Sequence, residues 1–238
     1  MKLPALFLLL TFVACSSPPP PYANTVGVLK AGSTMTVNID SGVVNAYKPA
    51  EGDPPDRYTI SATALSASSP PPAPAVRSNG KGIVVDATGP LAYLLVRVPE
   101  GVNLVVHSRS GNVNVTDISG NADVTAESGD VKIMIAGRAQ AHTRNGSIDA
   151  TVGAASWPGV LRFSSDNGDV TVYVRTTAAF MARMHTDDGT LFTDFDLRGT
   201  SIGNNETIDA PVNGGGASSV DLWSKRGAVR LLRLVPQA

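Results

Sequence analysis

The sequence predicts an all-β fold, a single-stranded parallel β-helix or β-solenoid with coils of roughly 17–22 residues. Three observations predict it. Six glycines are each followed, two and four positions later, by residues that are mostly apolar. They recur at intervals of roughly twenty residues, and the side chains on both sides of each alternate between apolar or small and polar. The repeated glycines are Gly111, Gly129, Gly146, Gly168, Gly189 and Gly227.

Each of these glycines is expected at a corner between two short strands. Residues five and three positions before it, and two and four after it, share the interior face, whereas residues four and two positions before it point outward. A strand of about five residues cannot bury its apolar face alone, so the coils must stack at about 4.8 Å, with a right-handed crossover as the default. The outward row two positions before the corner is charged throughout: Arg109, Glu127, Arg144, Asp166, Asp187 and Lys225.

The N-terminal segment is expected to direct export. Lys2 precedes an apolar run that is too short to span a bilayer, which predicts a lipoprotein signal peptide over residues 1–14. Cys15, the only cysteine, follows directly and resembles the lipidated cysteine of bacterial lipoproteins, and Ser16 resembles an outer-membrane address. An ordinary secretory signal with an incidental cysteine is the alternative. Residues 15–24 are expected to form a Ser/Pro tether.

Residues 25–238 are expected to form the solenoid. An earlier copy of the corner surrounds Gly42. A Pro-rich loop near residues 66–76 is expected between this copy and the regular array, because prolines do not fit a central strand. The last interval between corner glycines is twice the others, which predicts an additional coil with a degraded corner near residues 205–216.

Three segments resemble one known family. Residues 96–101, Val-Arg-Val-Pro-Glu-Gly, lead into the array, and a Ser-Gly-x-Val-x-Val type of corner recurs at residues 110–115 and 128–133. Residues 213–216 read Asn-Gly-Gly-Gly before the final corner. In this order the segments resemble the bacterial β-strand-repeat domains named putative adhesins. The resemblance implies a solenoid and an envelope location, and it implies no demonstrated activity.

Composition and motifs limit the functions to be considered. The formal net charge is −1 and 16% of the residues are charged, so no basic surface for nucleic acid is expected. The sequence contains no nucleotide-binding fingerprint, no Ser-His-Asp order and no metal-ligand cluster. It therefore predicts no nucleotide, no cofactor, no metal ion and no catalytic residue, and the protein is not expected to be an enzyme.

A second outward row, four positions before the corner, contains three histidines and a tryptophan: His107, His142, His185 and Trp223. Alternate coils would separate neighbouring histidines by about 9–10 Å. One zinc ion needs its ligand nitrogens within about 3–4 Å of one another, so it cannot join two of them. The row is interpreted as a polar surface ladder, and a weak, pH-dependent contact surface is the functional alternative.

Asp166 and Asp187 are expected to be neighbours in the charged row, about 5 Å apart, which is the separation of the carboxylates in a retaining glycosidase. A polysaccharide hydrolase or lyase is therefore an alternative function, although an exposed row does not raise the pKa of a catalytic acid. A low-affinity calcium site that adds Asp188 is another alternative.

The leading hypothesis is a non-enzymatic, lipid-anchored β-solenoid of the bacterial cell envelope, an adhesin-like or scaffold protein held in the outer membrane by the lipid on Cys15. Cell-wall glycan, an envelope protein and a host surface are the candidate partners. An envelope-stress or assembly accessory protein is a further alternative. The candidate binding residues are His107, His142, His185, Trp223, Asp166 and Asp187.

Overall fold

A computed structural model of the chain describes residues 22–65, 71, 73–203 and 205–234. The regular elements in these ranges are β-strands, and most neighbouring strands run parallel. This arrangement confirms the predicted all-β solenoid. In the same ranges, no helix is long and apolar enough to cross a membrane. The expected signal peptide, Cys15 and the tether as far as residue 21 lie outside the described residues.

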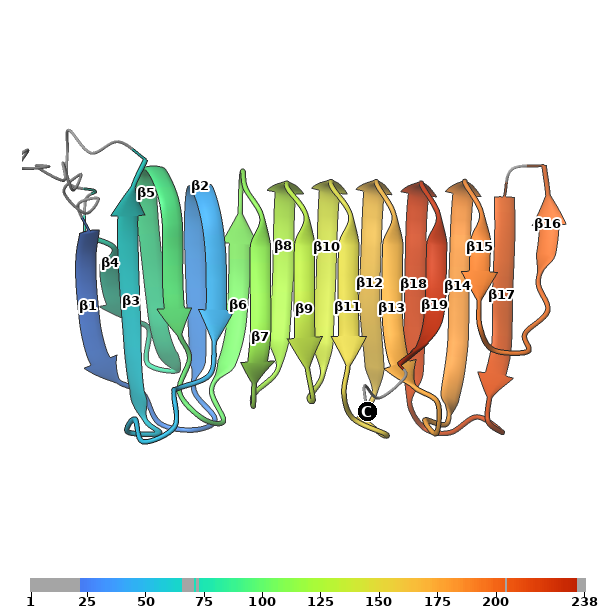
Figure 1. Cartoon of the computed structure of the whole chain (residues 1–238), viewed down its shortest axis with the longest axis horizontal. Helices are drawn as coiled ribbons and strands as arrows, with labels where there is room; N and C mark the ends of the chain where they lie inside the picture. Colours follow the sequence, from blue (N-terminus) through green and yellow to red (C-terminus); the bar gives the residue numbers. More distant parts are fainter. Residues whose placement is uncertain (1–21, 66–70, 72, 204, 235–238) are drawn as a thin grey trace, which may run out of the picture.

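Each coil contributes one strand to each of two sheets. Within each sheet the strands follow one another along the long axis of the molecule (Figure 1). In spatial order, the first sheet contains β4 (Ala75–Ser78), the first half of β5 (Gly82–Arg97), the first half of β2 (Thr34–Tyr47), β6 (Asn103–Ser108), β8 (Ala122–Ser128), β10 (Ala139–Asn145), β12 (Val160–Asn167), β18 (Ser219–Arg226), β14 (Phe180–Asp188), β17 (Asn205–Val212) and β16 (Thr200–Ile202). The second sheet contains β1 (Tyr22–Val28), β3 (Arg57–Ala64), the second halves of β5 and β2, β7 (Val113–Ile118), β9 (Val131–Ile135), β11 (Ile148–Val152), β13 (Val170–Arg175), β19 (Val229–Leu234) and β15 (Leu191–Thr193).

The coils do not stack in the order of the sequence. β2 lies between β5 and the β6–β7 coil, and the last coil, β18–β19, is inserted between β12–β13 and β14–β15 (Figure 1). The expectation of a degraded coil near residues 205–216 is wrong, because β17 runs antiparallel to β14 at the end of the stack. β3 covers the opposite end, antiparallel to β5. Antiparallel strands thus cover both ends of the first sheet and the N-terminal end of the second, whereas at the C-terminal end of the second sheet β15 pairs, among the described residues, only with β19.

The charged row explains part of this order. In the observed stack it reads, with signs that alternate at every step, Asp40, Arg109, Glu127, Arg144, Asp166, Lys225 and Asp187. The Arg109 Nη1 atom lies 3.3 Å from the Asp40 Oδ1 atom. Opposite charges on neighbouring strands contribute about 0.2–1 kcal/mol per pair, whereas like charges destabilise. Stacking in sequence order would place Asp166 beside Asp187.

The corner glycines form a column in which no side chain fits. Gly129 has a φ of 134°, and a Cβ atom built there would lie 2.3 Å from the carbonyl oxygen of Gly111. Glycine adopts this positive φ without steric cost, and the close approach of the next coil is a second reason for glycine at the corner. A Cβ atom would meet a carbonyl oxygen at 2.0–2.3 Å at all six repeated corners: Gly111, Gly129, Gly146, Gly168, Gly227 and Gly189.

The small residues three positions before each corner are buried, as predicted, and several of them also satisfy corner carbonyl groups. The Thr143 hydroxyl donates to the Gly129 oxygen at 3.1 Å. Equivalent bonds to the corner carbonyls of adjacent coils come from Ser165, Ser224 and Thr186, at 2.8, 2.8 and 3.0 Å. At these four positions a small hydroxyl side chain therefore serves for hydrogen bonding as well as for space, whereas Ala126 meets the requirement for space alone.

The irregular segments complete the core. Trp157, in the loop between β11 and β12, is 4% exposed, and its ring centroid lies 5.4 Å from that of Phe180. Its Nε1 atom donates to the Ser219 carbonyl oxygen at 3.2 Å. In the expected loop near residues 66–76, Pro71 and Pro74 are buried, but Ala75 already begins β4.

The expected tether also ends earlier than predicted. Residues 22–24 belong to β1, which pairs antiparallel with β3, so the strand begins within the segment that was expected to extend from residue 15 to residue 24.

Candidate functional site

The outward-facing surface of the first sheet, called the outer wall here, carries every candidate binding residue of the sequence analysis. Its central row crosses the stack from β5 to β17 and contains Asp86, Asn38, His107, Thr125, His142, Ser164, Trp223, His185 and Thr207. His107 is exposed, and His142, His185 and Trp223 are half-buried. The charged row runs beside it. The wall is therefore polar along its whole length, with one large aromatic side chain in its central row.

The structure changes the expected spacing of the histidines. Thr125 separates His107 from His142, which is the alternate-coil spacing that the sequence predicts. Ser164 and Trp223 both lie between His142 and His185, so these two are three strands apart, about 14 Å. The expectation of alternate coils is wrong for His185 because the last coil is inserted beside it. The imidazoles form separate contacts along the wall.

The expected pairing of Asp166 and Asp187 is also wrong. β18 lies between the strands that carry them, and Lys225 occupies the intervening position of the charged row. Two strand spacings, about 9.6 Å, separate the backbone positions of the two residues. This exceeds the separation of about 5–5.5 Å that a retaining glycosidase needs, and a cation lies between them. Asp188 lies opposite Arg226.

In the part of the chain that the structure describes, no group of three or more His, Cys, Asp or Glu side chains could hold a metal ion. The alternative of a calcium site at Asp166, Asp187 and Asp188 therefore has no such cluster among the described residues to support it.

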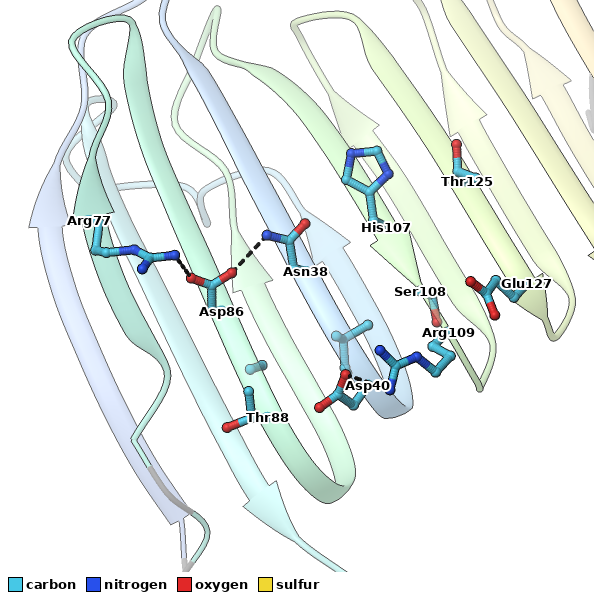
Figure 2. A pocket seen from close by; sticks show the side chains of 12 residues that line it. Asn38, Asp40, Arg77, Asp86, Thr88, His107, Ser108, Arg109, Thr125 and Glu127 are labelled. Carbon is cyan, nitrogen blue, oxygen red and sulfur yellow. Dashed lines mark hydrogen bonds and ion pairs between the residues drawn. The ribbon is translucent and has the colours of Figure 1, made fainter.

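A groove of about 540 Å³, the N-terminal groove, lies in the part of the outer wall that β4, β5, β2, β6 and β8 form. Figure 2 shows its central ion pairs. The Asp86 carboxylate accepts a hydrogen bond from Asn38 Nδ2 at 2.7 Å and also pairs with Arg77 (Figure 2). Asp40 pairs with Arg109 lower in the groove. Both acidic groups are thus already neutralised by cations.

The other side chains of the N-terminal groove are less constrained. Figure 2 places His107 between Asn38 and Thr125 and places Glu127 at the far edge. Among the described residues, the His107 ring has no hydrogen-bond partner. The ring can therefore donate a hydrogen bond to a molecule in the groove or accept one from it.

A second groove, of about 390 Å³, lies across β12, β18, β14 and β17 and is called the C-terminal groove. Four charged side chains of alternating sign form one side of it. Arg162 Nε lies 3.6 Å from Asp221 Oδ2, and Arg183 Nη1 lies 3.3 Å from Asp221 Oδ1. Arg183 Nε lies 3.9 Å from Asp209 Oδ1. The side chains of this row hold one another in place across four strands.

The other side of the C-terminal groove contains a hydrogen-bonded string. His185 Nε2 lies 2.7 Å from Asp187 Oδ1, and His185 Nδ1 lies 3.0 Å from Thr207 Oγ1. The three residue types match those of a catalytic triad, but an acyl-transfer site also needs free N–H donors for an oxyanion. Thr207 lies in β17, which pairs with β14 on one side and β16 on the other, so its neighbouring amides belong to the sheet. The string orients His185.

One carboxylate outside the wall has a structural role. Burial raises the pKa of Asp169, but hydrogen bonds from Arg230 Nη1 at 2.6 Å and the Ala228 amide at 2.9 Å outweigh that effect. The net result is a pKa below the ordinary value of 3.8. Asp169 therefore joins two coils that lie about sixty residues apart in the sequence.

The sequence analysis did not identify the outer-wall side chains that come from strands without the corner glycine repeat. Asp86 and Arg77 come from β5 and β4, and Thr207 and Asp209 come from the antiparallel β17. None of them follows the corner glycine pattern. The outward alternation within β17 was the available signal, since Thr207 and Asp209 lie two residues apart on one face.

The model of the Toastrack DUF4097 family matches residues 97–231, which is more than half of the chain. The protein therefore belongs to the Toastrack DUF4097 family, a family of β-solenoid domains. No curated protein matches the chain.

Two solved structures are similar to this chain over about nine tenths of its length. A crystal structure titled as a putative cell adhesion protein from Clostridium sporogenes is 12% identical, with a TM-score of 0.48 over 90% of this chain and 100% of that one. A putative adhesin from Bacteroides fragilis is 10% identical, with a TM-score of 0.33 over 90% and 97%. Similarity at this level carries no argument about the function of this chain.

Proposed function

We propose that the protein is a non-enzymatic, lipid-anchored binding protein of the bacterial cell envelope, with an adhesin-like role, and that its outer wall contacts the partner. One observation carries the proposal. The wall presents continuous rows of polar and oppositely charged side chains across the stack, with two grooves in the same face. The predicted signal peptide and Cys15 supply the expected route to the outer membrane.

The physical basis is pre-organisation. The side chains of the wall project from a stacked sheet, and several are held by ion pairs or hydrogen bonds with the next coil, as with His142 Nδ1 and Ser164 Oγ at 2.9 Å. A surface that is already ordered loses less conformational entropy when a partner binds. Charges of both signs alternate, so the wall favours a partner with matching polar groups over a polyanion.

Polysaccharide cleavage by Asp166 and Asp187 is not proposed, because Lys225 lies between them. A binding surface needs no pair of carboxylates at catalytic spacing, and the paired charges of the wall are already neutralised by one another. The wall therefore supports recognition better than it supports general acid–base chemistry.

The binding claim is tested with the Cys15→Ser chain, purified without lipid, and isolated envelope fractions or whole cells. Arg144→Glu reverses a charge in the middle of the outer wall, and Lys132→Glu makes the same change on an exposed residue of β9 in the second sheet. We expect Arg144→Glu to weaken capture and Lys132→Glu to leave it unchanged, with thermal melts to confirm folding. Equal capture by all three proteins would remove the support for the outer wall as the binding surface.

The anchoring claim has a separate test. Cys15→Ser should abolish acylation and move the protein from the membrane fraction to the soluble fraction. Unchanged membrane fractionation of this variant would reject lipid anchoring.

A further inference from the structure

Trp223 is the large aromatic side chain of the outer wall, and the core does not use it. It is half-buried and lines the C-terminal groove. The other tryptophan, Trp157, is 4% exposed and donates its indole N–H to a backbone carbonyl group. Among the described residues, the Trp223 indole N–H has no such acceptor. An apolar ring with an unused donor in a polar groove is suited to a ligand that has both an apolar face and hydroxyl groups.

The polar groups beside Trp223 are fixed on both sides. His185 lies directly opposite it on the next strand and is held by Asp187 and Thr207 at 2.7 and 3.0 Å. On the other side, Asp221 accepts from Arg183 at 3.3 Å. Planar side chains that are held in one geometry can exchange paired hydrogen bonds with adjacent hydroxyl groups without further ordering.

The charge of the groove decides between ligand classes. Its charged lining residues are Arg162, Arg183, Asp209 and Asp221, two cations and two anions that are paired with one another. The formal sum of these four charges is zero. A polyanion or a cation would have to break these pairs, whereas a neutral molecule rich in hydroxyl groups would not. The volume of about 390 Å³ lies within the range of small-molecule sites, about 300–1,000 Å³.

We propose that the C-terminal groove is a carbohydrate subsite that binds a neutral pyranoside, with the C–H face of one sugar ring against Trp223. The inference rests on the proposed function, since it names the partner chemistry of the same wall. The sugar hydroxyl groups bond to the Thr207 hydroxyl on one side and to Arg183 and Asp221 on the other, and His185, whose two ring nitrogens bond to Asp187 and Thr207, holds the Thr207 hydroxyl in place. The adjoining Ser164 and His142 extend the row along the wall, so the groove accommodates part of a longer glycan.

The test uses the Cys15→Ser protein and its two tryptophans as internal probes. Neutral oligosaccharides of glucose, galactose, mannose and N-acetylglucosamine are titrated while fluorescence and calorimetric heat are recorded. We expect at least one of them to change the emission, and Trp223→Ala to weaken its binding about tenfold or more. Trp223→Phe should retain part of the affinity but lose the fluorescence change, because the remaining Trp157 is buried.

Phe192→Ala is the matched control, because Phe192 is an aromatic residue of β15 in the second sheet with 55% of its surface exposed. Its affinity for the oligosaccharide should equal that of the parent. Binding that survives Trp223→Ala, or that falls equally in Phe192→Ala, would overturn the assignment of the site.

Failure of this inference can be separated from failure of the proposed function. If none of the neutral oligosaccharides binds but envelope capture still depends on Arg144, the carbohydrate subsite is refuted and the binding wall remains. If capture and oligosaccharide binding are both missing in folded protein, both proposals are refuted.

Discussion

Gly129→Ala is the substitution that tests the glycine column most sharply. Gly129 lies near the middle of the stack, has a φ of 134°, and a Cβ atom there would lie 2.3 Å from the Gly111 carbonyl oxygen. Two penalties follow. The alanine must hold a backbone conformation that costs about 1–3 kcal/mol, and the two coils must separate locally, at a further cost of about 1–3 kcal/mol typical of overpacking. We expect a loss of about 2–6 kcal/mol in the free energy of unfolding.

This loss should be visible in a thermal melt. For a chain of this size, 1 kcal/mol changes the Tm by about 2–4 °C, so the Tm of Gly129→Ala should fall by about 5–20 °C. A domain with a typical stability of about 5–15 kcal/mol would lose a large part of it.

The control separates backbone strain from the contact between coils. Gly52 also has a positive φ, 87°, but nothing lies within 4 Å of a Cβ atom built on it. Gly52→Ala should therefore show only the backbone penalty, about 1–2 kcal/mol. If Gly129→Ala melts within 2 °C of Gly52→Ala, about the effect of 1 kcal/mol or less, the close stacking of the corners is refuted.

Three further predictions follow from the stack. Val131 is 1% exposed, so Val131→Asp should bury an unpaired carboxylate and lower the free energy of unfolding by several kcal/mol. Glu127→Gln, in the exposed charged row, should lower it by less than about 1 kcal/mol. Equal denaturation midpoints for the two variants would contradict the assigned register. Lys225→Asp should place three carboxylates in consecutive positions and lower the Tm, and added salt should reduce this loss; a salt-independent Tm would contradict the stacking order. Because the folded pKa of Asp169 is lowered, its contribution to stability is present above pH 3.8 and is lost as the pH falls through the folded pKa. Asp169→Asn should therefore be less stable than the parent at pH 7 and should approach it in strong acid, and a stability difference that is constant with pH would contradict this.

The repeat of the fold could be predicted because it is encoded locally. Glycine corners and the alternation around them fix which residues face inward, and Val131 and Glu127 lie as expected, buried and exposed. These features depend on backbone conformation and on the two-residue period of a strand, both of which can be read within one coil.

The order of the coils could not be predicted from the same pattern. The interior rows of every coil are built from similar aliphatic residues, so one neighbour packs nearly as well as another. Sequence order was the default assumption, and it is wrong at both ends of the stack. The alternation of charge was the available signal, since placing Lys225 between Asp166 and Asp187 separates two like charges.

This error in stacking order limited the candidate site. The outward positions of His185 and Trp223 follow from the repeat, but their adjacency requires the inserted β18. The contact of His185 with Thr207 requires the antiparallel β17, which has no corner glycine to identify it. Individual residues of the wall were therefore predictable, whereas the grooves that they form were not.

The outer wall as the binding surface is the central claim, and site-specific photo-cross-linking tests it most directly. A photoreactive amino acid would replace Thr125, in the central row of the wall, or Met134, which is 41% exposed in the second sheet. Each anchored protein is irradiated in intact cells, and the products are isolated and analysed for attached protein or glycan. Capture from Thr125 without capture from Met134 is the predicted result. Capture from Met134 alone, or equally from both positions, would contradict the claim.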